Sequence, residues 1–208
     1  MAHSSRFWDF IAKRYARSPV ADEAAYQKKL EITRGYLRPD MEMLEFGCGT
    51  GSTAIVHAPY VRHIRATDIS KKMLDIARAK MDAAGITNIT FERVDIDELD
   101  AGDGSYDIVL GMSILHLVRD KEAVIGKVHR MLKPDGIFVS STACLGETMA
   151  FFKYVGPIGS ALGLLPLVKV FTVPELVDSL THGGFVIEHQ WQPGKGKAVF
   201  IVARKADA

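Results

Sequence analysis

Residues 44 to 51 read Leu44-Glu45-Phe46-Gly47-Cys48-Gly49-Thr50-Gly51. A short apolar run of this kind, followed by an acidic residue and glycines at alternate positions, predicts a buried parallel strand that ends in a tight turn. Glycine adopts positive φ readily and lets another group approach the backbone closely. The next residues, 52 to 57, predict a helix, whose N-terminal amides form an electropositive platform. The sequence therefore predicts a backbone cradle at the carboxyl end of a strand.

The composition predicts one globular domain over residues 1–208. The chain has 208 residues, of which 48% are hydrophobic and 25% are charged, enough to bury a substantial core. Its 26 basic and 25 acidic side chains leave a formal charge of +1, which gives no broad positive surface for nucleic acid. The composition does not exclude a local basic patch.

Cysteine usage and hydropathy predict the setting of the protein. Two cysteines, Cys48 and Cys144, are too few for a disulfide framework and favour a reduced, cytoplasmic protein. The N-terminus lacks the apolar core of a secretory signal. No stretch reaches the roughly eighteen apolar residues of a membrane span, so we expect no transmembrane segment.

Strands and helices alternate along most of the chain. Strands are expected at 41–46, 64–67, 89–94, 106–110 and 137–141. Helices are expected at 7–37, in two pieces broken near Ser18-Pro19, after the N-cap residue Ser70, and at 121–132, where Pro134-Asp135-Gly136 supplies a turn. This alternation predicts a parallel sheet that is covered by helices on both faces.

Both ends of the chain depart from this alternation. Residues 1–38 form either two amphipathic helices packed on the sheet or a lid over a pocket, and the two readings are compatible. Residues 143–172 are too apolar for a free loop, which predicts a cover over the acceptor pocket, a further helical layer or a dimer contact. After a helix up to residue 182, strands at 185–192 and 198–203 are joined by so short a link that they must form an antiparallel hairpin.

Acidic residues close the first three expected strands: Glu45, Asp68 and Asp95. Ligands of open α/β sheets bind at the carboxyl edge, and a carboxylate about twenty residues after the first glycine suits two ribose hydroxyls. Any one of these residues alone is a weak signal, because an acidic residue at a strand end often caps a helix. The glycine spacing is G-x-G-x-G and not the dinucleotide pattern G-x-G-x-x-G, which favours a nucleoside ligand with an amino-acid moiety and no phosphate.

The chain resembles a known family at five successive motifs. These are residues 45–51, Thr67-Asp68-Ile69-Ser70 with Met73-Leu74, Val94-Asp95, Tyr106-Asp107-Ile108-Val109 with Leu115-His116, and Leu132-Lys133-Pro134-Asp135-Gly136. They resemble class I S-adenosylmethionine-dependent methyltransferases of the type 11, ubiquinone/menaquinone-biosynthesis-like kind. The resemblance implies an α/β fold, a Rossmann-like three-layer α/β/α sandwich. Its seven-stranded sheet would have the order 3-2-1-4-5-7-6, with strand 7 antiparallel.

The same resemblance implies S-adenosyl-L-methionine as the cofactor and S-adenosyl-L-homocysteine as its product. The glycines would let the backbone pass the methionine part near Glu45, Asp68 would hold the ribose, and Asp95 would accept from the adenine amino group. The complete expected set of cofactor-binding residues is Tyr15, Glu45, Gly47, Cys48, Gly49, Gly51, Asp68, Ile69, Met73, Asp95, Ile96, Gly111 and Met112.

Methyl transfer from a sulfonium requires alignment more than a shared catalytic residue. His116, just after the fourth strand, is the candidate catalytic base, and the alternative is a structural histidine bonded to a backbone carbonyl. The remaining histidines lack metal-ligand spacing, so no metal site is expected.

We expect the acceptor to be a small, partly apolar molecule. A methyltransferase that acts on RNA or protein is an alternative, disfavoured by the neutral charge. A regulatory domain that binds the cofactor without turnover is a second alternative, which the cofactor motifs do not exclude. A homodimer and a membrane-surface role for a lipid-quinone acceptor both stay open, although residues 143–171 lack a basic amphipathic face.

Overall fold

The computed structural model describes residues 2–147 and 168–206. The chain divides into two compact units, Met1–Leu99 and Asp100–Ala208. Each unit is described by itself below. The expected single domain, with its lid at 1–38 and its apolar segment at 143–172, stays a prediction. Residues 148–167 of that segment lie outside the described residues.

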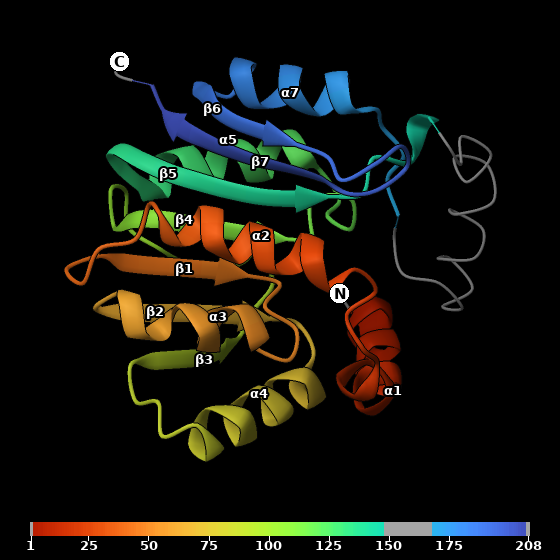
Figure 1. The fold of residues 1–208 in the computed structure, drawn as a ribbon, viewed down its shortest axis with the longest axis vertical. Coiled ribbons are helices and arrows are strands. Elements are labelled where there is room, and N and C mark those ends of the chain that lie inside the picture. Colours follow the sequence, from red (N-terminus) through yellow and green to blue (C-terminus); the bar gives the residue numbers. More distant parts are fainter. Residues whose placement is uncertain (1, 148–167, 207–208) are drawn as a thin grey trace. The chain divides into compact units, whose positions relative to one another are not determined.

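The first unit contains three parallel strands and the helices that pack around them (Figure 1). Its elements, in chain order, are α1 (Ala2–Arg17), α2 (Glu23–Arg34), β1 (Glu42–Phe46), α3 (Ser52–His57), the 3-10 helix η1 (Ala58–Tyr60), β2 (His63–Asp68), α4 (Lys71–Ala83) and β3 (Ile89–Arg93). β2 pairs with β1 on one side and with β3 on the other, so the residues that follow these strands reach the same edge of the sheet.

Local sequence explains where the helices of this unit begin and end. The break expected near Ser18-Pro19 separates α1 from α2, but α1 begins at Ala2, five residues before the expected start. The Asp22 side chain caps α2 by accepting from the Ala25 amide. Ser70 caps α4 as expected, and Gly85 follows the C-cap residue Ala84 with φ +65°, a conformation that favours glycine.

The second unit ends in the expected antiparallel hairpin. Its described elements are β4 (Tyr106–Met112), α5 (Lys121–Met131), β5 (Leu132–Thr142), the 3-10 helix η2 (Leu145–Glu147), α7 (Val173–His182), β6 (Phe185–Trp191) and β7 (Val199–Lys205). β7 runs antiparallel to β5 and to β6, and α7 lies along β6 (Figure 1). Thr172 and Glu175 form a capping box that begins α7.

The expected start of β5 was wrong. We expected a turn at Pro134-Asp135-Gly136 and then a strand, but β5 begins at Leu132, immediately after α5. Pairing with β4 passes from Tyr106 to Ile108 on one strand while it passes from Leu132 to Ile137 on the other. The additional residues form an irregularity in which Asp135 has φ +57°. The turn residues therefore bend a strand and do not precede it.

The described strands form a seven-stranded sheet with the order β3-β2-β1-β4-β5-β7-β6, flanked by helices. This confirms the fold that the resemblance implied. β4 is longer than expected, so Gly111 and Met112 are its last residues and do not follow it. No described helix combines the length and the apolar character that crossing a membrane requires.

Candidate functional site

The glycine turn after β1 has the backbone conformation that its sequence predicts. Gly47, Gly49 and Gly51 have φ values of +66°, +54° and +72°, in the left-handed region that favours glycine. The Cys48 amide donates to the Thr67 carbonyl at 2.9 Å, which ties the turn to β2. The turn is thus fixed beside the end of the neighbouring strand.

Two of these glycines meet different surroundings. A Cβ on Gly51 would lie 2.8 Å from the Ala77 Cβ and 2.9 Å from the Phe91 ring, so the missing side chain allows α4 and β3 to pack against the turn. At Gly49 the nearest atom to a Cβ would be a Tyr15 ring carbon at 4.0 Å. Gly49 therefore borders open space beside Tyr15, whereas Gly51 serves packing.

Asp68, the last residue of β2, is hydrogen-bonded through both carboxylate oxygens. Its Oδ2 accepts from the Gly49 amide at 2.9 Å and its Oδ1 from the Ser70 amide at 2.8 Å. Burial raises the pKa of Asp68, and these amide hydrogen bonds oppose that rise. Because a carboxylate has about four lone-pair sites, further hydrogen bonds can still form there. Asp68 joins the glycine turn to the start of α4.

Glu45 is buried in β1, with only 2% of its surface exposed. Its Oε2 has no hydrogen-bond partner among the described residues. Burial, with a smaller contribution from the Asp68 charge, raises the pKa of Glu45 to about 8, against an opposing hydrogen bond from the Ala54 amide. At pH 7 the side chain is therefore mostly a neutral acid that has one oxygen without a partner.

Two tyrosines, Tyr15 of α1 and Tyr26 of α2, lie near these carboxylates. Burial raises the pKa of Tyr15, and the charges of Asp68 and Glu45 raise it further, although 52% of the residue is exposed. Burial also raises the pKa of Tyr26, with a contribution from Glu45, while a hydrogen bond with the Thr53 side chain lowers it. The sequence indicated Tyr15 by resemblance, whereas it gave no sign of Tyr26, which lies in the stretch expected only to be helical.

The remaining expected residues of this unit have mainly structural contacts. Met73 and Ile96 are buried, and the Ile69 carbonyl accepts from Arg93 Nε at 3.0 Å. Asp95 Oδ1 accepts from the Asp97 amide at 3.2 Å and so stabilises the turn after β3. Their expected contacts with a cofactor stay predictions.

Cys48 is also buried, and burial raises the pKa of its thiol. This environment disfavours a nucleophilic role for Cys48, because a nucleophilic cysteine needs an accessible thiolate. The first unit thus brings together Tyr15, Glu45, Gly49 and Asp68, while Cys48 supports the turn.

The other expected residues, Gly111, Met112 and His116, belong to the second unit. Next to Met112, Ser113 has φ +58°, and its amide donates to the Ser141 carbonyl at 2.7 Å. Burial lowers the pKa of His116 to about 4, so its ring is neutral at pH 7. Its Nδ1 has no partner among the described residues, and its backbone carbonyl accepts from the Lys169 amide at 2.7 Å.

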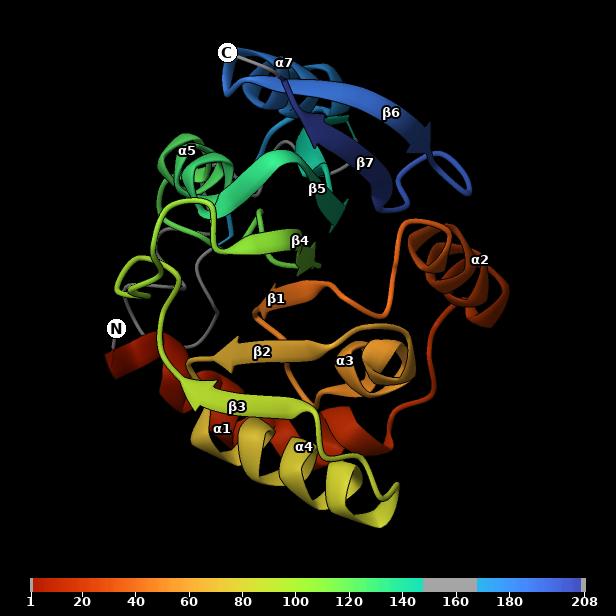
Figure 2. The ribbon, with the colours of Figure 1, turned by 90° about the vertical axis from the view of Figure 1, so that its left-hand side faces the viewer.

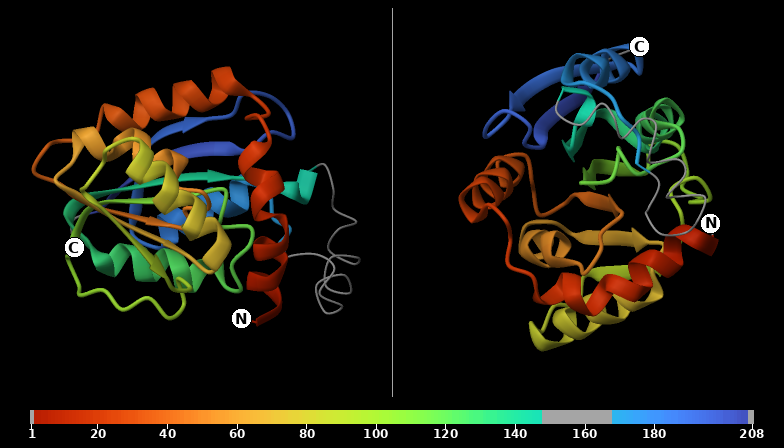
Figure 3. Two further views of the ribbon diagram at one scale, coloured as in Figure 1. Left: turned by 90° about the horizontal axis from the view of Figure 1, so that it is seen from below. Right: turned by 90° about the vertical axis from the view of Figure 1, so that its right-hand side faces the viewer.

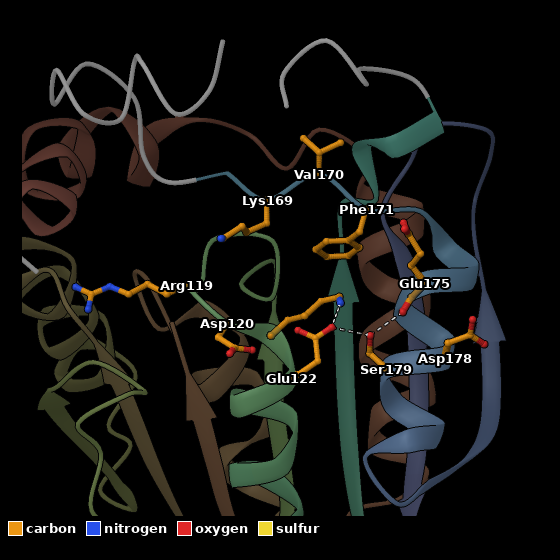
Figure 4. A pocket seen from close by; sticks show the side chains of 10 residues that line it. Arg119, Asp120, Glu122, Lys169, Val170, Phe171, Glu175, Asp178 and Ser179 are labelled. Carbon is orange, nitrogen blue, oxygen red and sulfur yellow. Dashed lines mark hydrogen bonds and ion pairs between the residues drawn. The ribbon is translucent and has the colours of Figure 1, made fainter. Parts of the chain in front are cut away.

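A pocket of about 520 Å³ lies at the N-terminal ends of α5 and α7 in the second unit (Figure 4). Charged side chains line most of it. Lys121 lies 5.3 Å from the centre of the Phe171 ring and pairs with Glu122, which also accepts from the Ser179 hydroxyl. This polar lining does not match the partly apolar acceptor that the sequence predicts.

Within the described parts of the chain, no group of histidine, cysteine and acidic side chains is arranged to hold a metal ion. His57, one of the histidines without metal-ligand spacing, is fully buried in α3. Burial lowers the pKa of His57 to about 4. It acts as a neutral packing residue.

Comparison with known proteins matches residues 37–164 to a family described as a methyltransferase domain. The uncharacterized methyltransferase YcgJ of Bacillus subtilis is 30% identical over 110 residues, which cover 53% of this chain and 44% of that protein. The ubiquinone/menaquinone biosynthesis C-methyltransferase UbiE of Vibrio vulnificus is 30% identical over 113 residues, which cover 52% of this chain and 44% of UbiE.

Among solved structures, the [4+2]-cyclase SpnF aligns with a TM-score of 0.80 at 16% identity, over 98% of this chain and 95% of that one. This likeness shows the fold alone. The chain spans less than half of the length of the two curated relatives described above. Since the family matches residues 37–164, which are more than half of the chain and include the glycine turn, the chain belongs to the methyltransferase-domain family, within the class I S-adenosylmethionine-dependent methyltransferases.

Proposed function

We propose that this chain binds S-adenosyl-L-methionine in the cradle of its first unit and transfers the methyl group to a small, partly apolar acceptor. The observation that supports this most is the joint arrangement of Gly49, Asp68 and Glu45. An open glycine, a carboxylate held by two backbone amides and a buried carboxyl with an unpartnered oxygen lie together at one sheet edge. Ligands of open α/β sheets bind at such an edge.

The residues of the cradle fit this cofactor chemically. Asp68 keeps lone-pair sites that can accept from ribose hydroxyls, and its surroundings hold it in one orientation. The unpartnered oxygen of Glu45 offers an acceptor for a cationic group, and a nearby cation would favour the ionised form of this acid. Gly49 leaves its side of the turn open to a ligand beneath Tyr15. Roles for Gly111 and Met112 stay predictions.

When bound, the cofactor supplies an electrophilic methyl group on a sulfonium, so the protein's main task is alignment and exclusion of water. Tyr15 would cover the Gly49 side of the cradle, and Glu45 and Asp68 would fix the ligand's orientation. His116 is neutral at pH 7 and would accept a proton only from an acceptor that loses one on transfer. With a pKa near 4, it is a weak base.

The acceptor class is supported by the relative named for C-methylation in ubiquinone and menaquinone biosynthesis, since such acceptors are partly apolar. We also infer a cytoplasmic setting, because Cys48 and Cys144 are both free thiols. The [4+2]-cyclase among the structural neighbours shows that one fold can carry other chemistry, so binding alone does not establish methyl transfer.

Two experiments test the proposal. Isothermal titration calorimetry should show saturable binding of S-adenosyl-L-homocysteine and none of NAD⁺, whose pyrophosphate this glycine spacing does not suit. Turnover is then measured with methyl-labelled cofactor and a panel of phenol, quinol and amine acceptors. Absence of cofactor binding would contradict the proposal, and binding without turnover on any acceptor would favour the regulatory alternative.

A further inference from the structure

The inner side of α1 carries an aspartate that reaches the start of another helix. Asp9 Oδ1 accepts from the Ser70 hydroxyl at 2.6 Å and from the Lys72 amide at 3.0 Å. Ser70 is itself the N-cap of α4 and accepts from the Met73 amide at 3.1 Å. α1 runs alongside α4 in two views of the ribbon (Figures 2 and 3). Asp9 therefore caps a helix to which it does not belong.

These bonds continue into the cradle. The Ser70 amide donates to Asp68, and the other oxygen of Asp68 accepts from the Gly49 amide. Tyr15, which comes from the same helix as Asp9, lies beside Gly49. α1 thus meets the cradle at two places, through the hydrogen bonds of Asp9 and through the ring of Tyr15.

Apolar burial of α1 is incomplete, because Phe7, Trp8 and Ile11 are only half-buried. Of the described residues of α1, Ala12 is the fully buried one, whereas Phe10 is 85% exposed and Tyr15 is 52% exposed. A buried alanine contributes little transfer free energy compared with a leucine or phenylalanine. Hydrogen bonds to a charged group, together with a carboxylate at a helix N-terminus, are stronger than most surface contacts.

The ionisation of Asp9 fits this contact. Partial burial raises the pKa of Asp9, but the hydrogen bonds from Ser70 and the Lys72 amide, with the charges of Arg93 and Lys72, outweigh burial and lower it. The carboxylate is therefore charged at neutral pH. Both of these hydrogen bonds go to the same oxygen, so an asparagine can keep them while it removes the charge.

We propose that Asp9 is a positioning residue that fastens α1 to the start of α4 and thereby holds Tyr15 over the cofactor cradle. This inference rests on the proposed function. Because docking of α1 and binding of the cofactor use one connected set of contacts, each stabilises the other. Loss of Asp9 therefore weakens cofactor binding without any change in a residue of the cradle.

The test compares Asp9→Ala, Asp9→Asn and the control Asp75→Ala. Asp75 is an exposed acid of α4 whose ion pairs run to Lys71 and Arg78 of the same helix. Calorimetry measures the Kd of S-adenosyl-L-homocysteine. Limited trypsin digestion measures detachment of α1, because Lys13, Arg14 and Arg17 are exposed cleavage sites. Thermal melting checks that each variant is folded.

We expect Asp9→Ala to raise the Kd about tenfold or more and to speed cleavage within α1 by a similar factor, as loss of a charged hydrogen bond predicts. Asp9→Asn should restore most of the affinity, and Asp75→Ala should match the native chain. In the native chain the ligand should slow cleavage of α1, and in Asp9→Ala this protection should be lost.

Equal affinity and equal cleavage in the native chain and Asp9→Ala would overturn the inference and leave the proposed function intact. If the native chain binds no S-adenosyl-L-homocysteine, the proposed function is overturned, and with it the link to the cofactor. Cleavage of the ligand-free chains then still decides whether Asp9 holds α1. Should Asp9→Ala fail to fold, Asp9→Ser takes its place, because the serine hydroxyl lies one bond closer to the backbone and is an alcohol without charge. A native Kd and a native cleavage rate in Asp9→Ser would then overturn the inference.

Discussion

The end of β2 and the segment after β4 differ in whether their buried polar atoms have hydrogen-bond partners. Asp68 has a backbone amide on each carboxylate oxygen, whereas His116 has a ring nitrogen with no partner among the described residues. A buried polar atom without a partner costs about 1–3 kcal/mol. The first region is therefore ordered before any ligand arrives, while the second leaves a hydrogen bond to be made. The unpartnered oxygen of Glu45 is the exception in the first unit.

The largest effect is expected from Asp68→Ala, which breaks the ordered side of this comparison. The substitution leaves the amides of Gly49 and Ser70 without their acceptor, at about 1–3 kcal/mol each. We expect a lower melting temperature and no measurable binding of S-adenosyl-L-homocysteine in calorimetry. The Asp75→Ala variant, which removes an exposed acid, serves as the control. Unchanged affinity in Asp68→Ala would contradict the assigned cofactor site.

A second variant separates packing from backbone conformation within the ordered region. Gly51→Ala places a Cβ 2.8 Å from Ala77 at φ +72°, whereas Gly85→Ala has similar φ, +65°, and nothing within 4 Å. The left-handed conformation costs roughly 1–2 kcal/mol in both variants. Overpacking adds about 1–3 kcal/mol to Gly51→Ala alone. Urea unfolding measures the difference, and equal losses of stability would show that the packing argument for Gly51 is wrong.

Much of the ordered region could be predicted from the sequence because its signals are local. The positive φ at the glycines, the Ser70 cap and the strand-end position of Asp68 each follow from residues close together in the chain. Resemblance added Tyr15. By contrast, the hydrogen bonds of Asp9 join residues about sixty positions apart, and no local pattern announces such a contact.

The features that the sequence analysis predicted wrongly or missed also depend on contacts between residues far apart in the chain. The residues Pro134-Asp135-Gly136 have the composition of a turn, yet pairing with β4 draws them into β5. Tyr26 lies in a helical pattern that indicates packing, and its place near Glu45 depends on how α2 meets α3. Local propensity decides a conformation only where tertiary pairing does not compete with it.

Glu45→Gln tests the buried carboxyl of the first unit, whose oxygen Oε2 has no partner among the described residues. Because the pKa of Glu45 is about 8 when folded and near 4.5 otherwise, its neutral form stabilises the fold below pH 4.5 and this contribution is lost as pH rises to 8. The variant should therefore gain melting temperature relative to the native chain between pH 5 and pH 8.5, by about 2–4 °C or more. A constant difference across this range would show that Glu45 ionises normally.

The same residue sets the pH dependence of cofactor binding. A cationic ligand favours the ionised carboxylate, so the native chain must release a proton on binding below pH 8. Affinity for S-adenosyl-L-methionine should rise with pH up to about 8 and then level off. Calorimetry in buffers of different ionisation enthalpy counts the proton released. Glu45→Gln should bind more weakly and release none, and proton release equal to that of the native chain would exclude Glu45 as its source.

The smallest effect is expected from His116→Leu, on the side with the unmade hydrogen bond. The pKa of His116 is about 4 when folded and near 6.5 otherwise, so its neutral form stabilises the fold above pH 6.5 and this contribution is lost as pH falls toward 4. Leucine removes both the titrating group and the unpartnered nitrogen. We therefore expect the melting temperature of the variant to fall less than that of the native chain between pH 7.5 and pH 4.5, and the two to differ little at pH 7.5. Cofactor affinity should stay unchanged, because the cradle belongs to the first unit. If His116 also accepts a proton from the acceptor, the turnover rate of the variant falls while its Kd for the cofactor stays constant. A variant that keeps full turnover would leave this histidine with a packing role alone.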